Sequence, residues 1–221
     1  MNTPCAAAAA AFIAAGYLIG GIPFGYLIGR MRGVDVRTVG SKNIGATNVF
    51  RTVGKKWGLL AFACDFLKGF LPTCAAIVVR GCWTSGGEPV LPFWLPVAVG
   101  FSCVVGHMLT PYMKFKGGKG VATAFGMLVA LVPGLVGIAF LIFAVMFALS
   151  HYISLGSCCA ALFLAVAVWH PFMFGNGSRE ALVVAVPITV MALFVVWKHR
   201  ANIKRLAHGE ENKIYLFGKP K

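Results

Sequence analysis

Residues 120–150 read GVATAFGMLVALVPGLVGIAFLIFAVMFALS and contain no charged side chain. A run this apolar is typical of helices that cross a lipid bilayer, yet one crossing needs only about 20 residues. Pro133 and Gly134 lie near its middle, and a proline followed by a glycine interrupts a helix. The run therefore predicts two short membrane-spanning helices, 120–133 and 134–150, joined by a tight turn.

The rest of the chain has the same character. Of its 221 residues 59% are hydrophobic and only 12% are charged, which is too little polar surface for a soluble globule of this size. We predict an all-α, polytopic membrane protein in which residues 1–221 form a single integral-membrane domain. Seven transmembrane helices are expected, at 5–29, 57–79, 91–112, 120–133, 134–150, 153–173 and 181–197.

The distribution of basic residues predicts the orientation in the membrane. Most of the 20 Lys and Arg residues fall in three segments, 30–56, 114–119 and the tail from residue 198. Basic segments flanking membrane helices remain on the cytoplasmic side. Seven crossings put all three segments on that side if the N-terminus lies outside. Six crossings would leave the basic tail on the opposite side of the membrane. The sequence thus predicts an outside N-terminus and a cytoplasmic C-terminus.

The formal net charge of +14 is explained by the same bias, together with attraction to anionic lipid headgroups. Membrane lipids are therefore expected partners. No motif for RNA or DNA binding is present, so nucleic acid is not expected to bind, and no obligate protein partner is evident. Lys55 and Lys219 are interpreted as membrane anchors.

Three polar clusters lie on the predicted cytoplasmic face: GSKNIGATNVFRTVG (40–54), GHMLTPYMKFKGGKGVAT (106–123) and HRANIKRLAHGEE (199–211). The first combines glycines, amides, hydroxyls and two basic side chains with no carboxylate. In the second, a helix that begins near Gly120 would direct its positive end at the loop, and glycines let backbone amides approach an oxyanion. Lys and Arg add compensating charge. The pattern predicts a site for a phosphate-like anion.

Several common enzyme designs are missing. The GGKG sequence does not complete GxxxxGK[ST], so ATP hydrolysis is not expected. No two histidines have the spacing of a zinc site, and no serine stands in a GxSxG turn. None of the five histidines is followed five residues later by the aspartate of soluble acyltransferases. Neither a metal nor a cofactor is expected.

Two ionisable residues fall inside a predicted span. Asp65 and Lys68 are three residues apart on one helix, so they face the same way and can neutralise each other. Each would cost roughly 2.5–3.5 kcal/mol to insert alone. A role in helix packing and a direct role in the site are both compatible with the sequence. His107 and Ser154 lie near span ends, where we expect wet, ordinary positions.

Five segments, taken in order, resemble the bacterial membrane glycerol-3-phosphate acyltransferases that use acyl phosphate as donor. The resemblance covers nearly the whole chain, and the GSKNIGATN block is highly distinctive. It implies a seven-span enzyme of the cell inner membrane, with its active site on the cytoplasmic face. The expected product is 1-acyl-glycerol 3-phosphate (lysophosphatidate), the first acylated intermediate of phospholipid synthesis. The segments are GIPFGYLIGR (21–30), GSKNIGATNVFRTVGKKWG (40–58), DFLKG (65–69), GHMLTPYMKFKGGKGVATAFG (106–126) and HRANIKRLAHGEE (199–211).

The resemblance also implies roles for individual residues, with the three motifs building one site. Lys42 stands where the family commonly has glycine, so it is given no role. His199 and the donor's own phosphate are the two candidate acceptors of the hydroxyl proton. The implied acyl-phosphate-binding residues are Ser41, Asn43, Gly45, Thr47 and Asn48. The implied glycerol-3-phosphate-binding residues are Arg51, Lys116, Gly117, Gly118, Lys119, His199 and Asn202. The implied catalytic residues are Ser41, Arg51, Lys119, His199 and Asn202, and the implied structural residues are Asp65, Lys68 and Glu210.

Two other classes of function use similar elements. An organic-phosphate or anion transporter would have the same basic and glycine-rich segments. Transport sites, however, are usually found near the bilayer midplane within inverted repeats, and no repeat is visible here. A non-catalytic lipid-binding scaffold would not require three ordered polar motifs.

Overall fold

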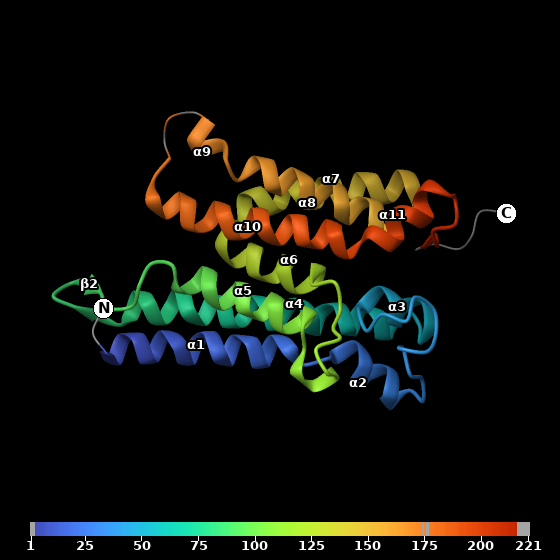
Figure 1. The fold of residues 1–221 in the computed structure, drawn as a ribbon, viewed down its shortest axis with the longest axis horizontal. Coiled ribbons are helices and arrows are strands. Elements are labelled where there is room, and N and C mark those ends of the chain that lie inside the picture. The colour runs from blue at the N-terminus through green and yellow to red at the C-terminus, as the bar shows by residue number, and fades with distance from the viewer. Residues whose placement is uncertain (1–2, 174, 176, 216–221) are drawn as a thin grey trace. The chain divides into compact units, whose positions relative to one another are not determined.

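The structure is a computed structural model that describes residues 3–173, 175 and 177–215. The anchoring residue predicted at Lys219 lies outside this range. The described chain is mostly helical, as predicted, with one small hairpin between β1 (Thr84–Ser85) and β2 (Glu88–Pro89) (Figure 1). It separates into two compact units, unit 1 (Met1–Val132) and unit 2 (Pro133–Lys221).

Six helical segments of the described chain are long and apolar enough to cross a membrane, which supports an integral membrane protein. The break predicted at Pro133 is confirmed, because one helix ends at Leu131 and the next begins at Pro133. The helix before the break, Val121–Leu131, has 11 residues. At 1.5 Å per residue it is about 16 Å long, roughly half the hydrocarbon thickness. The six segments are Pro4–Met31, Lys55–Cys82, Leu95–Met113, Pro133–Ser150, Ile153–Met173 and Arg179–Lys198.

Unit 1 is a bundle in which α1 lies along α5, and α4 lies along both α5 and α6 (Figure 1). The short α3 packs against α4. Their bounds are α1 (Thr3–Gly21), α2 (Phe24–Met31), α3 (Ala46–Thr52), α4 (Lys55–Cys82), α5 (Leu95–Met108), a 3-10 turn (Pro111–Met113) and α6 (Val121–Leu131).

Glycines bring these helices into backbone contact. A Cβ at Gly20 of α1 would overlap the backbone of Cys103 in α5, and one at Gly106 of α5 would overlap the carbonyl of Tyr17. Gly126 of α6 touches the α4 backbone in the same way. Lipid tails are as apolar as side chains, so membrane helices associate through such close packing rather than through the hydrophobic effect.

The first predicted span is interrupted at Pro23, between α1 and α2. α1 ends before Pro23, so the carbonyls of Gly21 and Ile22 have no N–H partner one helical turn further along the chain. Two side chains replace them: Thr110 Oγ1 donates to Gly21 O at 2.6 Å, and Lys68 Nζ donates to Ile22 O at 2.7 Å. An unsatisfied carbonyl is costly inside a bilayer, so both donors stabilise the break.

Unit 2 is a smaller bundle in which α7 and α10 each pack against α8. The N-terminus of α10 is capped by Ser178, whose Oγ accepts a hydrogen bond from Ala181 N at 3.2 Å. His199 separates α10 from α11, so the chain bends there without a loop. The bounds are α7 (Pro133–Ser150), α8 (Ile153–Ala167), α9 (His170–Met173), α10 (Arg179–Lys198) and α11 (Arg200–Ala207).

Candidate functional site

The loop before α3, together with α3 itself, is held by isolated apolar residues. Val36 and Val49 are completely buried, and Ile44 is nearly so. They share one core cluster with Ile28 of α2 and Ala61 of α4. The loop lacks an apolar run, yet every few residues it inserts one aliphatic side chain into unit 1. These insertions fix the polar residues between them.

Asn48 organises the polar part of the same loop. Its side chain is 1% exposed, and its Oδ1 accepts a hydrogen bond from Ser41 N at 2.9 Å. Its Nδ2 donates to Val36 O at 2.7 Å and to Val39 O at 3.2 Å. Gly40 has φ +59°, and a Cβ there would overlap Asn48 Oδ1. The amide predicted to bind acyl phosphate is thus used within the loop, where it fixes the backbone at Ser41.

A second amide stabilises the turn that leads into α3. Asn43 Oδ1 accepts a hydrogen bond from Gly45 N at 2.8 Å. Two residues implied as acyl-phosphate ligands, Asn43 and Gly45, therefore contact each other. The hydroxyl of Thr52 donates to Asn48 O at 2.8 Å, so it too is part of the local framework.

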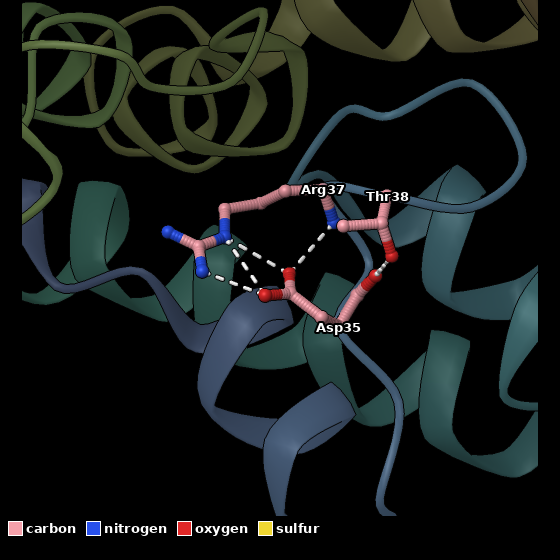
Figure 2. A network of polar contacts seen from close by, with 3 residues as sticks. All are labelled: Asp35, Arg37 and Thr38. Atoms are coloured by element: carbon pink, nitrogen blue, oxygen red, sulfur yellow. Dashed lines mark hydrogen bonds and ion pairs between the residues drawn. The ribbon is translucent and has the colours of Figure 1, made fainter.

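The loop begins with an ion pair that the sequence patterns did not predict (Figure 2). Arg37 donates to both carboxylate oxygens of Asp35 and lies over the ring of Tyr26, 4.6 Å from its centroid. The Thr38 hydroxyl donates to Asp35 O at 2.9 Å. The side-chain and backbone hydrogen bonds from Arg37 lower the pKa of Asp35 to about 2. This carboxylate is therefore neutralised by Arg37 rather than left to repel an anion.

The glycine-rich loop between α5 and α6 lies flat on the end of α5. Gly117 N donates to Met108 O at 3.2 Å, and Gly118 N donates to His107 O at 3.0 Å. A Cβ at Gly117 would overlap the His107 carbonyl, and one at Gly118 would overlap the His107 ring at Nε2. The amides of Gly117 and Gly118, implied to face a phosphate, are instead bonded to α5. Only glycine fits at either position.

Beneath this loop lies a buried polar cluster. Lys68 Nζ is 2.7 Å from Asp65 Oδ1, so the predicted pairing of the two residues is confirmed, and both side chains are 2% exposed. His107 Nδ1 lies 3.6 Å from the same carboxylate oxygen. The expectation of a wet His107 is wrong, because its side chain is buried. No signal in the sequence joined His107 to the Asp65–Lys68 pair.

In unit 2, the third motif places His199 at the junction of α10 and α11. Its side chain is 3% exposed, and Nδ1 lies 2.8 Å from Val195 O. A carbonyl can only accept, so Nδ1 carries the hydrogen. In the neutral ring Nε2 then holds the lone pair, which is the arrangement a proton acceptor requires.

After α11 the chain is bonded to α8 and α11 by the carboxylate of Glu211. Its Oε1 accepts from Asn202 Nδ2 at 2.6 Å and from Ser154 Oγ at 3.2 Å, while its Oε2 accepts from Arg205 Nε at 2.7 Å. Burial opposes the charge, but the hydrogen bonds from Asn202 and Arg205 outweigh it and hold the pKa of Glu211 below its usual 4.5. This group orients the Asn202 amide.

Two expectations about unit 2 are corrected here. The structural glutamate was placed at Glu210, yet that side chain is exposed, and Glu211 makes the buried contacts instead. The two are adjacent, and Gly209, at φ +70°, turns the chain so that the second one faces inward. Ser154, expected to be wet, is also buried, because its hydroxyl is bonded to Glu211.

The implied site residues belong to both units and differ in how exposed they are. Those of the first two motifs belong to unit 1 and those of the third to unit 2. Among the described residues, no three His, Cys, Asp or Glu side chains are grouped as metal ligands. Ser41 and Lys116 are exposed; Asn43, Gly45, Thr47, Arg51, Gly117 and Lys119 are half-buried; Asn48, Gly118, His199 and Asn202 are buried.

Comparison with known proteins identifies the family. The family model for glycerol-3-phosphate acyltransferase matches residues 10–209. A glycerol-3-phosphate acyltransferase of Endomicrobium trichonymphae is 42% identical over 206 residues, covering 92% of this chain and 94% of that protein. One from Aquifex aeolicus is 38% identical over 198 residues, covering 90% and 95%.

Solved structures agree with the sequence relatives. The crystal structure of PlsY, an integral membrane glycerol 3-phosphate acyltransferase, in its glycerol 3-phosphate form is 37% identical with a TM-score of 0.80. It covers 96% of this chain and 100% of that chain. The lysphosphatidic acid form of PlsY gives a TM-score of 0.76 at 35% identity, covering 94% and 96%. The chain belongs to the glycerol-3-phosphate acyltransferase family of integral membrane enzymes.

Proposed function

We propose that the protein transfers a fatty acyl group from acyl phosphate to the 1-hydroxyl of sn-glycerol 3-phosphate. The products are 1-acyl-glycerol 3-phosphate (lysophosphatidate) and inorganic phosphate, in the first acylation step of phospholipid synthesis. The observation that carries the proposal is the match over nearly the whole chain to PlsY in its glycerol 3-phosphate and lysphosphatidic acid forms. The loop chemistry supports it, since two phosphate-bearing substrates need cationic and hydroxyl groups rather than carboxylates.

Acyl phosphate is a mixed anhydride with a good leaving group, so no acyl-enzyme is needed. The 1-hydroxyl oxygen attacks the acyl carbon, a new ester C–O bond forms, and the bond from the acyl carbon to the phosphate oxygen breaks. Phosphate leaves with that electron pair. Binding both substrates in register supplies much of the rate, and donors aimed at the developing charge supply more.

The first two motifs are proposed to bind the phosphates. Ser41, whose backbone N–H is fixed by Asn48, presents its exposed hydroxyl to the acyl phosphate. Thr47 and the backbone near Gly45 complete that subsite. Arg51 and Lys119 bind glycerol 3-phosphate as charges, and the Lys116 amine at the mouth of the glycine loop adds to them. Because the amides of the two central glycines are already bonded to α5, those glycines shape the subsite rather than donate to the ligand.

The third motif is proposed to handle the nucleophile. Glu211 orients the Asn202 amide, which hydrogen-bonds glycerol 3-phosphate. His199, with its hydrogen on Nδ1, offers Nε2 to the 1-hydroxyl as a hydrogen-bond or proton acceptor. The other acceptor open to the proton is a phosphate oxygen of the donor. We propose that both units of the chain serve this one reaction as a single acyltransferase domain, with no cofactor and no obligate protein partner.

The enzyme is proposed to be a multi-pass protein of the bacterial inner membrane. In this proposal the segment that contains the short α6 makes a seventh crossing, the N-terminus lies outside, and the active site and C-terminus are cytoplasmic. Only that arrangement keeps every basic segment on one side. Single cysteines at positions 45, 117 and 208 of a cysteine-free protein should react with an impermeant thiol reagent only from the cytoplasmic side. Cysteines at 86 and 177 should react from outside. Labelling of position 208 from outside would remove the seven-span arrangement.

One assay tests the reaction itself. Purified protein in detergent receives acyl phosphate and labelled glycerol 3-phosphate, and phosphate release and lysophosphatidate are followed together. They should appear in a 1:1 ratio with acyl phosphate, while acyl-CoA and acyl carrier protein should not support turnover. Efficient use of acyl-CoA would contradict the proposed donor.

Variants then test the assigned roles. A hydrogen bond to a charged group contributes about 1.5–3 kcal/mol, so Ser41→Ala and Arg51→Ala should each lose roughly ten- to a hundredfold in activity. His199→Gln separates two roles, because glutamine can replace a hydrogen-bonding group but not a base. Lys55→Ala, at the exposed start of α4, is the control and should retain turnover. If Lys55→Ala and Arg51→Ala lose the same activity, the basic residues of this face act only through their combined charge. The assignment of a defined phosphate site to the first loop would then be wrong.

A further inference from the structure

The glycine-rich loop rests on one side chain, His107. The three heavy atoms nearest to a Cβ built at Gly118 all belong to the His107 imidazole, and the closest is Nε2. The Gly118 amide donates to the carbonyl of the same histidine at 3.0 Å. The loop therefore touches both the ring and the backbone of His107. The orientation of the ring determines how closely the loop can approach α5.

The opposite edge of the imidazole faces a buried ion pair. His107 Nδ1 is 3.6 Å from Asp65 Oδ1, and Lys68 Nζ is 2.7 Å from the same oxygen. Lys68 is in turn bonded to Ile22 O at the break between α1 and α2. A continuous chain of polar contacts thus runs from that break, through α4 and α5, to the glycine-rich loop.

The break between α1 and α2 accounts for Lys68, which donates to Ile22 O, but not for the histidine beside the ion pair. Burying an ammonium and a carboxylate in a span is costly, and the same volume could be filled by apolar side chains at no loss of stability.

The His107 ring is buried, with Asp65 near one edge and Gly118 against the other, so it has little room to turn. A ring fixed in this way gives the loop one defined height above the end of α5. Lys116 and Lys119 flank the two glycines of this loop, so its height sets the position of both amines.

We infer that His107, buried beside the Asp65–Lys68 pair, is a positioning residue that sets the affinity for glycerol 3-phosphate by fixing the Lys116–Gly120 loop. The inference rests on the proposed function, because it assigns that loop to the glycerol 3-phosphate phosphate. His107 acts through the loop and does not itself contact substrate.

The contact between His107 and Gly118 permits a specific rescue test. Gly118→Ala places a methyl group on the imidazole, so the loop must lift, and KM for glycerol 3-phosphate should rise by roughly tenfold or more. KM for acyl phosphate and kcat should change far less. His107→Ala alone should raise KM for glycerol 3-phosphate, because the loop loses the ring that fixes it. In that protein the methyl group has room, so adding Gly118→Ala should change KM by no more than about a further threefold.

Gly117 supplies the matched control. A Cβ there meets the backbone of His107 and Met108 rather than a side chain. Gly117→Ala should therefore raise KM for glycerol 3-phosphate to the same extent with and without His107→Ala. A general loss of stability cannot restore KM in the Gly118→Ala double variant to that of His107→Ala while leaving it raised in the Gly117→Ala double variant. The melting temperatures of the five variants, compared with that of the unmodified protein, measure any loss of stability separately.

The outcomes separate the two proposals. If the unmodified protein does not turn over glycerol 3-phosphate with acyl phosphate, the proposed function fails and the inference fails with it. If it turns over but Gly118→Ala has the same effect in both backgrounds, the inference alone is wrong. Should Gly118→Ala be too unstable to purify, the double variant decides: recovery of a protein with the kinetics of His107→Ala supports the inference, and its failure to fold contradicts it.

Discussion

Asn48 offers the most direct test of how the first loop is built. Replacing it by aspartate keeps its shape and the oxygen that accepts from Ser41 N, but removes the amide that donates to Val36 O and Val39 O. Val36 is completely buried, so its carbonyl would be left without a donor, at about 1–3 kcal/mol. Val39 is partly exposed, and loss of that longer bond adds about 1 kcal/mol.

Asn48→Asp should therefore destabilise the closed loop by about 2–4 kcal/mol, which is roughly a hundredfold increase in its open fraction. Trypsin reports that fraction, because cleavage after an exposed residue such as Arg37, which adjoins neither substituted position, follows the population of locally open molecules. The digestion is done on protein without substrate, so that charge effects on acyl phosphate binding do not enter.

Asn43→Asp is the control, since the same substitution five residues away should leave the loop closed. The Asn43 side chain acts as an acceptor from Gly45 N, and a carboxylate accepts equally well. Its digestion rate should stay within a few-fold of the unmodified protein. If Asn48→Asp and Asn43→Asp are digested equally slowly, Asn48 does not hold the loop and is better assigned as a ligand of acyl phosphate.

Three further predictions concern stability in detergent. Lys68→Met should lower the free energy of unfolding by about 3–5 kcal/mol, because it leaves a buried carboxylate unpaired. Adding Asp65→Asn should restore part of that stability. A double variant that is still less stable would contradict the pairing. Gly106→Ala should destabilise the protein by about 1–3 kcal/mol, while Gly81→Ala, which meets nothing within 4 Å, should not. The pKa of Glu211 is lower in the folded state, so its stabilisation is complete above pH 4.5 and is lost as the pH falls through the lower folded value. Melting temperatures of the unmodified protein should fall in acid more steeply than those of Glu211→Gln.

The sequence by itself determined the class of protein and the break in its longest apolar run. Lipid tails cannot hydrogen-bond, so a charge-free run must be helical, and a proline inside it must end a helix. These are local rules, which is why the interruption at Pro133 was predicted correctly. The same rules did not predict the interruption at Pro23, because a short apolar stretch continues beyond it.

The motif residues were also visible in the sequence, but what each side chain contacts was not. From the sequence, Asn48 is interpreted as a polar group available to a ligand. In the structure its side chain is enclosed by the loop and bonded to the loop backbone. Glu210 and Glu211 are chemically identical, and only the direction in which Gly209 turns the chain decides which one is buried.

Tertiary structure alone decided the surroundings of His107. Nothing near it in the sequence distinguishes it from a histidine at a wet span end. It becomes part of a buried cluster because α4 packs beside α5 and because the loop returns over it, contacts that join residues about 40 positions apart and 11 positions apart in the chain. Hydrophobic pattern and turn chemistry act over a few residues, whereas the partners of a buried polar group are set by which helices meet.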